Sequence, residues 1–120
     1  MGGRFTKNSY NIEFIRSLLF VFDIENADDE ERERLISSKN VNDQKELSDL
    51  FDEVLRSEFF AYKQKGREVL INTISYYLNK NDNFDRVFDR MTTYFDDDVV
   101  NQRRFMEVLL MCLQRYQLEG

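Results

Sequence analysis

The chemistry open to this chain is limited by the residue types that it lacks. Histidine is absent from its 120 residues, and Cys112 is the only cysteine. These absences remove the commonest general base near neutral pH, the usual zinc ligands and any internal disulfide. Asp and Glu are numerous, with 23 in total, but they form no recognisable metal-binding motif. The sequence also contains no recognisable phosphate-binding loop. We therefore expect no catalytic residue, no metal site and no cofactor, and a protein that works by binding other macromolecules.

Basic side chains lie next to aromatic rings around Gly66. The group comprises Arg56, Phe60, Tyr62, Lys63, Lys65 and Arg67. Cations can contact phosphates while rings stack on bases, so the pattern is compatible with RNA binding. An ordinary helix C-terminus has the same composition, because Lys and Arg are favourable near the negative end of the helix dipole.

A second basic pair, Arg103 and Arg104, opens the last predicted helix. The helix dipole favours acids in a first turn, so this position suggests a binding partner for the arginines. Asp97 and Asp98, directly upstream, could equally neutralise them.

The net charge of −6 is unevenly distributed along the sequence. Residues 23–53 contain twelve acids and four bases, a local charge of −8, so the rest of the chain sums to +2. A basic surface for nucleic acid is therefore compatible with an acidic protein. The acidic stretch itself is either a solvated helical face or a surface that binds a partner.

The elements that position these residues are predicted to be helices almost throughout. Proline is absent, Gly66 is the only glycine between Gly3 and Gly120, and apolar residues recur at helical spacing. We expect a single all-α domain over residues 1–120, a compact bundle of about five helices in which residues 1–10 could form a flexible arm. The helical stripes cover residues 12–22, 43–65, 70–78, 84–95 and 105–116, with a short exposed helix near 28–37.

Particular boundaries and core positions follow from this pattern. Gly66 should end or kink the long helix 43–65, and the run Asp96–Asp98 should end one helix and cap the last. The residues expected in the core at the middle of the stripes are Leu50, Phe51, Val54, Phe88 and Leu109.

Two further features bear on location. No apolar run approaches the roughly 20 residues that cross a bilayer, and the single cysteine suits a reducing compartment, so we expect a cytoplasmic protein without a membrane partner. Residues 1–6 (MGGRFT) match the N-myristoylation pattern, although the same residues also suit an unmodified chain start.

Three segments, read in order, resemble the small helical subunit of type III-A CRISPR effector complexes, the Csm small subunit. They are Ile15–Leu19, the series Leu55, Phe59 and Tyr62 followed by Gly66-Arg67-Glu68 as the end of a central helix, and Arg104–Leu109 with Tyr116 near the chain end. The resemblance implies a non-catalytic subunit that assembles with larger subunits and holds the backbone of guide and target RNA. The side chains that would contact phosphates are Arg16, Lys63, Lys65, Arg67, Arg103, Arg104 and Arg115. We expect the basic residues around Gly66 and at the start of the last helix to form one surface that faces away from the acidic stretch.

An alternative hypothesis assigns the function to the acidic stretch. Small acidic helical inhibitors, such as the immunity protein of a bacterial nuclease toxin or a phage-encoded antagonist, occupy the basic groove of their target with carboxylates and associate rapidly. The partner would then be a nuclease toxin instead of RNA.

Overall fold

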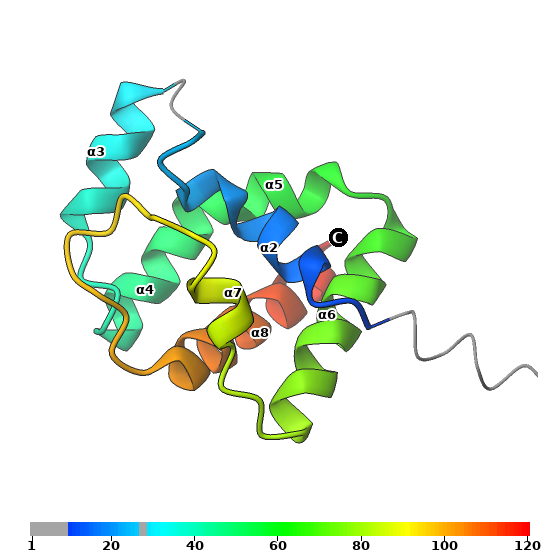
Figure 1. Ribbon diagram of the computed structural model, residues 1–120. Coiled ribbons are helices and arrows are strands. Elements are labelled where there is room, and N and C mark those ends of the chain that lie inside the picture. Colours follow the sequence, from blue (N-terminus) through cyan, green and yellow to red (C-terminus); the bar gives the residue numbers. More distant parts are fainter. Residues whose placement is uncertain (1–9, 27–28) are drawn as a thin grey trace, which may run out of the picture.

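The computed structural model describes residues 10–26 and 29–120 and confirms the all-α fold class (Figure 1). Within this part of the chain, the only β-type pairing is an isolated antiparallel bridge between Asp23 and Thr93. The helices are α2 (Glu13–Leu19), continued by the 3-10 turn η2 (Phe20–Phe22), α3 (Glu30–Ser38), α4 (Gln44–Leu50), the π-helical segment η3 (Phe51–Leu55), α5 (Arg56–Ala61), α6 (Gln64–Asn79), α7 (Asp85–Phe88) and α8 (Gln102–Glu119).

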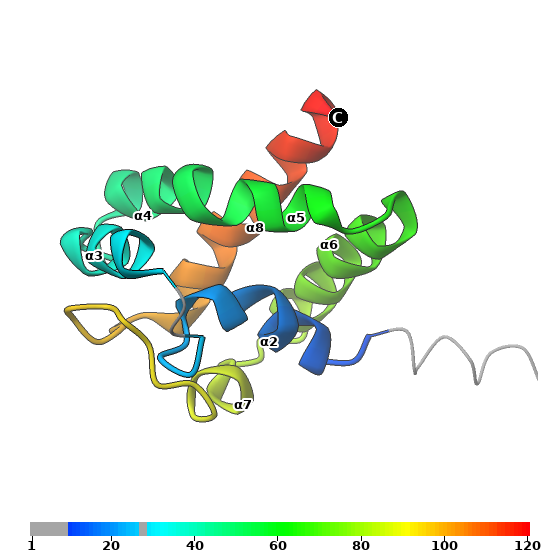
Figure 2. The same ribbon diagram turned by 90° about the horizontal axis from the view of Figure 1, so that it is seen from above.

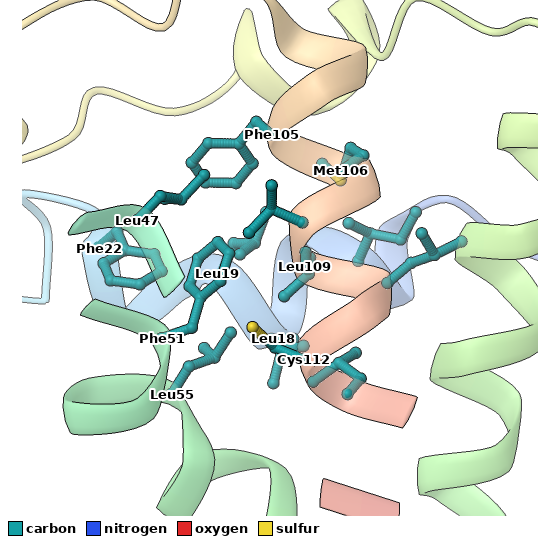
Figure 3. Packing of buried hydrophobic residues seen from close by; sticks show 14 of the residues in the cluster. Leu18, Leu19, Phe22, Leu47, Phe51, Leu55, Phe105, Met106, Leu109 and Cys112 are labelled. Carbon is teal, nitrogen blue, oxygen red and sulfur yellow. The ribbon is translucent and has the colours of Figure 1, made fainter. Parts of the chain in front are cut away.

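Helix α8 lies at the centre of the core. Its buried face packs against α6 and against α4, η3 and α5, which follow one another as one rod, here called the central rod (Gln44–Ala61; Figure 2). Figure 3 shows side chains of α8 facing those of the rod and of α2. Four of the expected core residues, Leu50, Phe51, Val54 and Leu109, are buried, whereas Phe88 is half-buried with its ring edge-on to Phe105 at 5.2 Å.

The long helix ends earlier than expected. Asp43 caps its start by accepting a hydrogen bond from the Glu46 amide at 3.0 Å, and the helix ends at Ala61. Tyr62 and Lys63 are extended, and Gly66 lies inside the first turn of α6. The prediction that Gly66 breaks the helix was therefore wrong. The chain turns from α5 into α6 through Tyr62 and Lys63, which are not glycines, and Gly66 comes after the turn.

The helix expected over residues 84–95 is reduced to the single turn α7. From Asp89 to Asn101 the chain forms a loop whose backbone bonds to the segment after α2. The Ile24 amide donates to the Thr92 carbonyl at 2.8 Å and the Tyr94 amide donates to the Phe22 carbonyl at 3.0 Å. Thr and Tyr are weak helix formers, so these tertiary bonds replace helical ones.

The last helix has a different cap from the one expected. Asn101 accepts a hydrogen bond from the Arg104 amide at 3.0 Å, and the run Asp96–Asp98 lies upstream in the loop. The short polar helix is confirmed as α3, which buries Ile36 and leaves Leu35 half-buried. The proposed arm and myristoylation pattern lie almost wholly outside the described residues.

Candidate functional site

Lys63 and Lys65 are exposed at the corner between α5 and α6. Neither ammonium group forms an ion pair or hydrogen bond with another described residue. Of the basic side chains predicted to contact RNA, these two are available to an external anion without losing an internal contact.

Arg67 is half-buried and bound to backbone carbonyls of its own chain. Its Nε donates to the Tyr62 carbonyl at 2.9 Å, and its Nη2 donates to the Phe60 carbonyl at 3.1 Å. The guanidinium also lies 5.1 Å from the centre of the Phe60 ring. The last carbonyls of a helix lack intrahelical partners, so Arg67 satisfies the end of α5 and fixes the corner.

Arg115 belongs to a polar cluster near the C-terminal end of α8. Its Nη2 lies 2.7 Å from Asp52 Oδ1, which also accepts a hydrogen bond from the Tyr116 hydroxyl at 2.6 Å. This pairing with Asp52 raises the pKa of the Arg115 guanidinium. Burial, followed by the hydrogen bond to Asp52, raises the pKa of Tyr116. The charge of Arg115 is therefore largely compensated within the protein.

The second basic pair also has internal partners. Arg103 donates to the Asp82 carbonyl at 3.1 Å and to the Leu78 carbonyl at 3.4 Å, and so covers the C-terminal end of α6. Arg104 donates to Gln44 Oε1 at 2.9 Å. In the described structure, Arg103 and Arg104 therefore bind these groups and do not pair with Asp97 or Asp98, as the sequence had suggested they could.

The predicted phosphate contacts are thus not gathered into one cluster. Lys65 and the Leu78 carbonyl that binds Arg103 are separated by most of α6, about 20 Å at 1.5 Å per residue. Arg16 lies on α2, where it pairs with Glu13. The motif Gly66-Arg67-Glu68 begins α6 and does not end the central helix, so this part of the resemblance to the CRISPR subunit was misplaced.

The fold brings together acidic segments that are far apart in the sequence. The loop 89–101 bonds to residues 22–24, as described above, and also to Asn42. The Asn42 side chain donates to the Asp98 carbonyl at 2.8 Å and accepts from the Val100 amide at 3.0 Å. Figure 1 shows α3, α4 and this loop on one side of the molecule and α6 on the other.

We call the described parts of residues 23–53 and 89–101 the acidic side. In the sequence these two ranges contain 16 acids and 5 bases, a charge of −11, and the remaining residues contain 7 acids and 12 bases, a charge of +5. The run Asp96–Asp98 is exposed, as are Glu30 and Glu31, and none of these carboxylates forms an ion pair with another described residue. The sequence led us to expect a helix cap at Asp96–Asp98, because the residues near this run do not show which part of the protein the loop 89–101 contacts.

A cleft of about 380 Å³ opens within the loop, with Asp89, Asp97 and Asp98 among its lining residues and Phe88 and Phe95 as its aromatic part. The described residues contain no group of three or more Asp, Glu or Cys side chains placed to hold a metal ion. In the same residues, no helix combines the length and the apolar character that crossing a membrane requires.

Comparisons with protein-family models, with curated proteins and with solved structures gave no match for this chain.

Proposed function

We propose that this protein is a non-catalytic inhibitor whose acidic side binds a basic protein surface, such as the nucleic-acid-binding groove of a nuclease toxin. The observation that carries the proposal is that the fold bonds together the two acidic ranges, 23–53 and 89–101, which carry −11 in the sequence against +5 for the other residues. A nuclease binds a polyanion, so its groove is positively charged. Unpaired carboxylates held on a folded surface attract such a groove and speed association.

The unpaired state of the carboxylates supports binding over a purely structural role. Among the described residues of the acidic side, Lys39 pairs with Glu53 at 3.4 Å and Lys45 pairs with Asp49 at 3.2 Å, and neither pair involves Asp96–Asp98. Repulsion among unpaired like charges destabilises a compact state. A cationic partner would relieve that repulsion.

The test compares two variants with the same change in net charge, placed on the acidic side in one and elsewhere in the other. Asp97→Lys with Asp98→Lys changes the net charge by +4 on the acidic side, and Glu68→Lys with Glu107→Lys makes the same change at exposed positions elsewhere. The partner is first isolated with the tagged protein from its native host, identified, and produced separately. Association rates are then measured by surface plasmon resonance at two salt concentrations.

We expect the acidic-side variant to slow association about tenfold or more at low salt and the matched variant to slow it by less than threefold. Inhibition of the partner's nuclease activity should follow the same order. Equal effects of the two variants would show that net charge alone acts, and recovery of RNA with no basic protein would contradict the proposal.

A second candidate function is the RNA-contacting subunit of a crRNA-guided complex. One observation favours it: Lys63 and Lys65 are exposed at the α5–α6 corner and have no ion pair or hydrogen-bond partner for their ammonium groups among the described residues, in the part of the chain that carries +5. Under this hypothesis Lys63→Ala with Lys65→Ala weakens binding to all RNA sequences alike and reduces its salt dependence in the assembled complex. The acidic-side variant would leave RNA binding intact.

A further inference from the structure

A groove runs between α3 and the central rod on the acidic side. Figures 1 and 2 both show α3 beside α4. The groove has a volume of about 420 Å³, within the range of pockets that receive ligand groups. Its lining comes from three parts of the chain: η2, α3 with its cap residue, and the rod from η3 to α5.

The groove has an apolar floor and an acidic rim. Val21, Leu35 and Val54 supply the floor. The rim carboxylates are Asp29, Glu31, Glu53 and Glu58, all exposed. Arg32 is the single cation among the lining residues, and Lys39 pairs with Glu53 at 3.4 Å, so negative charge remains in excess around the rim.

This combination matches basic side chains that are attached to a partner protein. Lys and Arg have apolar stems and charged ends, so their stems can cover an apolar floor while their ends reach the carboxylates. Glu53 and Glu58 are five residues apart on the rod, about 7.5 Å along a helix, and Asp29 and Glu31 lie on the other side of the groove. One small cation cannot neutralise carboxylates spread over both sides.

We propose that this groove receives a segment of the protein partner in which Lys or Arg side chains flank a hydrophobic side chain. The inference rests on the proposed function and specifies where on the acidic side the partner inserts. The hydrophobic side chain contacts the floor, and the basic side chains pair with the rim on both sides. Charge attracts the partner over distance, and the floor sets which segment fits.

The test uses an amphipathic peptide of Leu and Lys as the probe and the isotope-labelled full chain as the target. A Leu/Glu peptide of the same pattern, oligolysine of the same charge and spermidine serve as comparison ligands. Binding is followed through the methyl signals of Val21, Leu35 and Val54 in NMR spectra. Glu31→Gln with Glu58→Gln removes two rim charges, and Asp97→Asn with Asp98→Asn removes two charges from the loop 89–101, which does not line the groove.

We expect the Leu/Lys peptide to shift the three floor methyl signals and to bind the rim variant about five- to tenfold more weakly, because two ion pairs with the rim are lost. The Asp97 and Asp98 variant should bind within twofold of the original protein. Three results would each contradict the proposed binding groove. They are shifts confined to residues 96–98, floor shifts of equal size with oligolysine or spermidine, and no binding of the Leu/Lys peptide. The proposed function would then still be judged separately by the association rates of the native partner.

Discussion

The side chain of Asn42 joins the start of the central rod to Asp98, a residue 56 positions later in the chain. Its amide nitrogen donates to the Asp98 carbonyl at 2.8 Å, and its oxygen accepts from the Val100 amide at 3.0 Å. A carbonyl and an amide of the loop are both bonded to one side chain. Asn42 therefore holds the run Asp96–Asp98 against the acidic side.

Replacing Asn42 should release this part of the loop. We expect Asn42→Ala to lower the free energy of unfolding by about 1 to 3 kcal/mol, because two hydrogen bonds are lost. Hydrogen exchange at the Val100 amide should accelerate at least tenfold. Asn72→Ala, at an exposed position on α6, is the matched control and should change neither quantity appreciably. Unchanged exchange at Val100 in Asn42→Ala would show that other contacts hold the loop.

The contribution of Asn42 illustrates what the sequence could and could not reveal about the acidic side. The run at residues 23–53 is visible as a local charge of −8. The loop 89–101 joins it through tertiary hydrogen bonds, made by Asn42 and by the segment 22–24 with Thr92 and Tyr94. Such pairings depend on the whole fold, so spacing along one sequence does not predict them.

Arg67 should behave as a structural residue and its neighbours Lys63 and Lys65 should not. Arg67→Ala removes two charge-assisted bonds to carbonyls at the end of α5, and we expect a loss of about 1 to 3 kcal/mol in urea unfolding. Arg67→Lys should recover only part of this, because an ammonium cannot reproduce the planar fork. Lys63→Ala and Lys65→Ala should each change stability by less than about 0.5 kcal/mol. A loss at Lys63 equal to that at Arg67 would contradict this assignment.

Gly66→Ala should stabilise the protein. Gly66 lies in α6 with negative φ, and an added Cβ would lie 3.5 Å from the nearest Tyr62 side-chain atoms, an ordinary van der Waals contact. Alanine restricts the unfolded chain more than glycine does, so we expect a gain of about 0.5 to 1 kcal/mol in the free energy of unfolding. A destabilised variant would show that the added Cβ does not fit beside Tyr62.

Most helices could be predicted because their buried faces repeat with the helical period, as in Phe105, Leu109 and Tyr116 on α8. The failures occurred where side chains from elsewhere override local preference. At the α5–α6 corner, Arg67 bonds the carbonyls that end α5, and the chain turns through Tyr62 and Lys63 before the glycine. The internal partners of Arg67, Arg103 and Arg104 could not be predicted for the same reason, since a sequence shows the charge of a residue and not the internal groups that bind it.

Tyr116 should make stability depend on pH above about 10. Its side chain is fully buried, and burial, together with the hydrogen bond to Asp52, raises its pKa above the ordinary tyrosine value of about 10. The folded protein therefore keeps the phenolic proton at pH values where the unfolded chain releases it. This contribution to stability is complete below pH 10 and is lost as the pH rises, with a slope of up to about 1.4 kcal/mol per pH unit. The raised pKa values of Tyr62 and Tyr94 act in the same direction.

Tyr116→Phe removes both the hydroxyl and its titration, and the two effects appear at different pH. At pH 8 the variant should be less stable than the original protein by about 0.5 to 2 kcal/mol, because Asp52 loses one hydrogen-bond donor. Between pH 10 and 11 the original protein should lose about 1 kcal/mol more than the variant, so the difference narrows. Urea unfolding at pH 8, 10 and 11 measures both effects on the free energy of unfolding. Tyr76→Phe, at an exposed ring, is the control and should lower the free energy of unfolding by less than about 0.5 kcal/mol at pH 8. A constant difference at all three pH values would mean that Tyr116 ionises equally easily in the folded and unfolded chain.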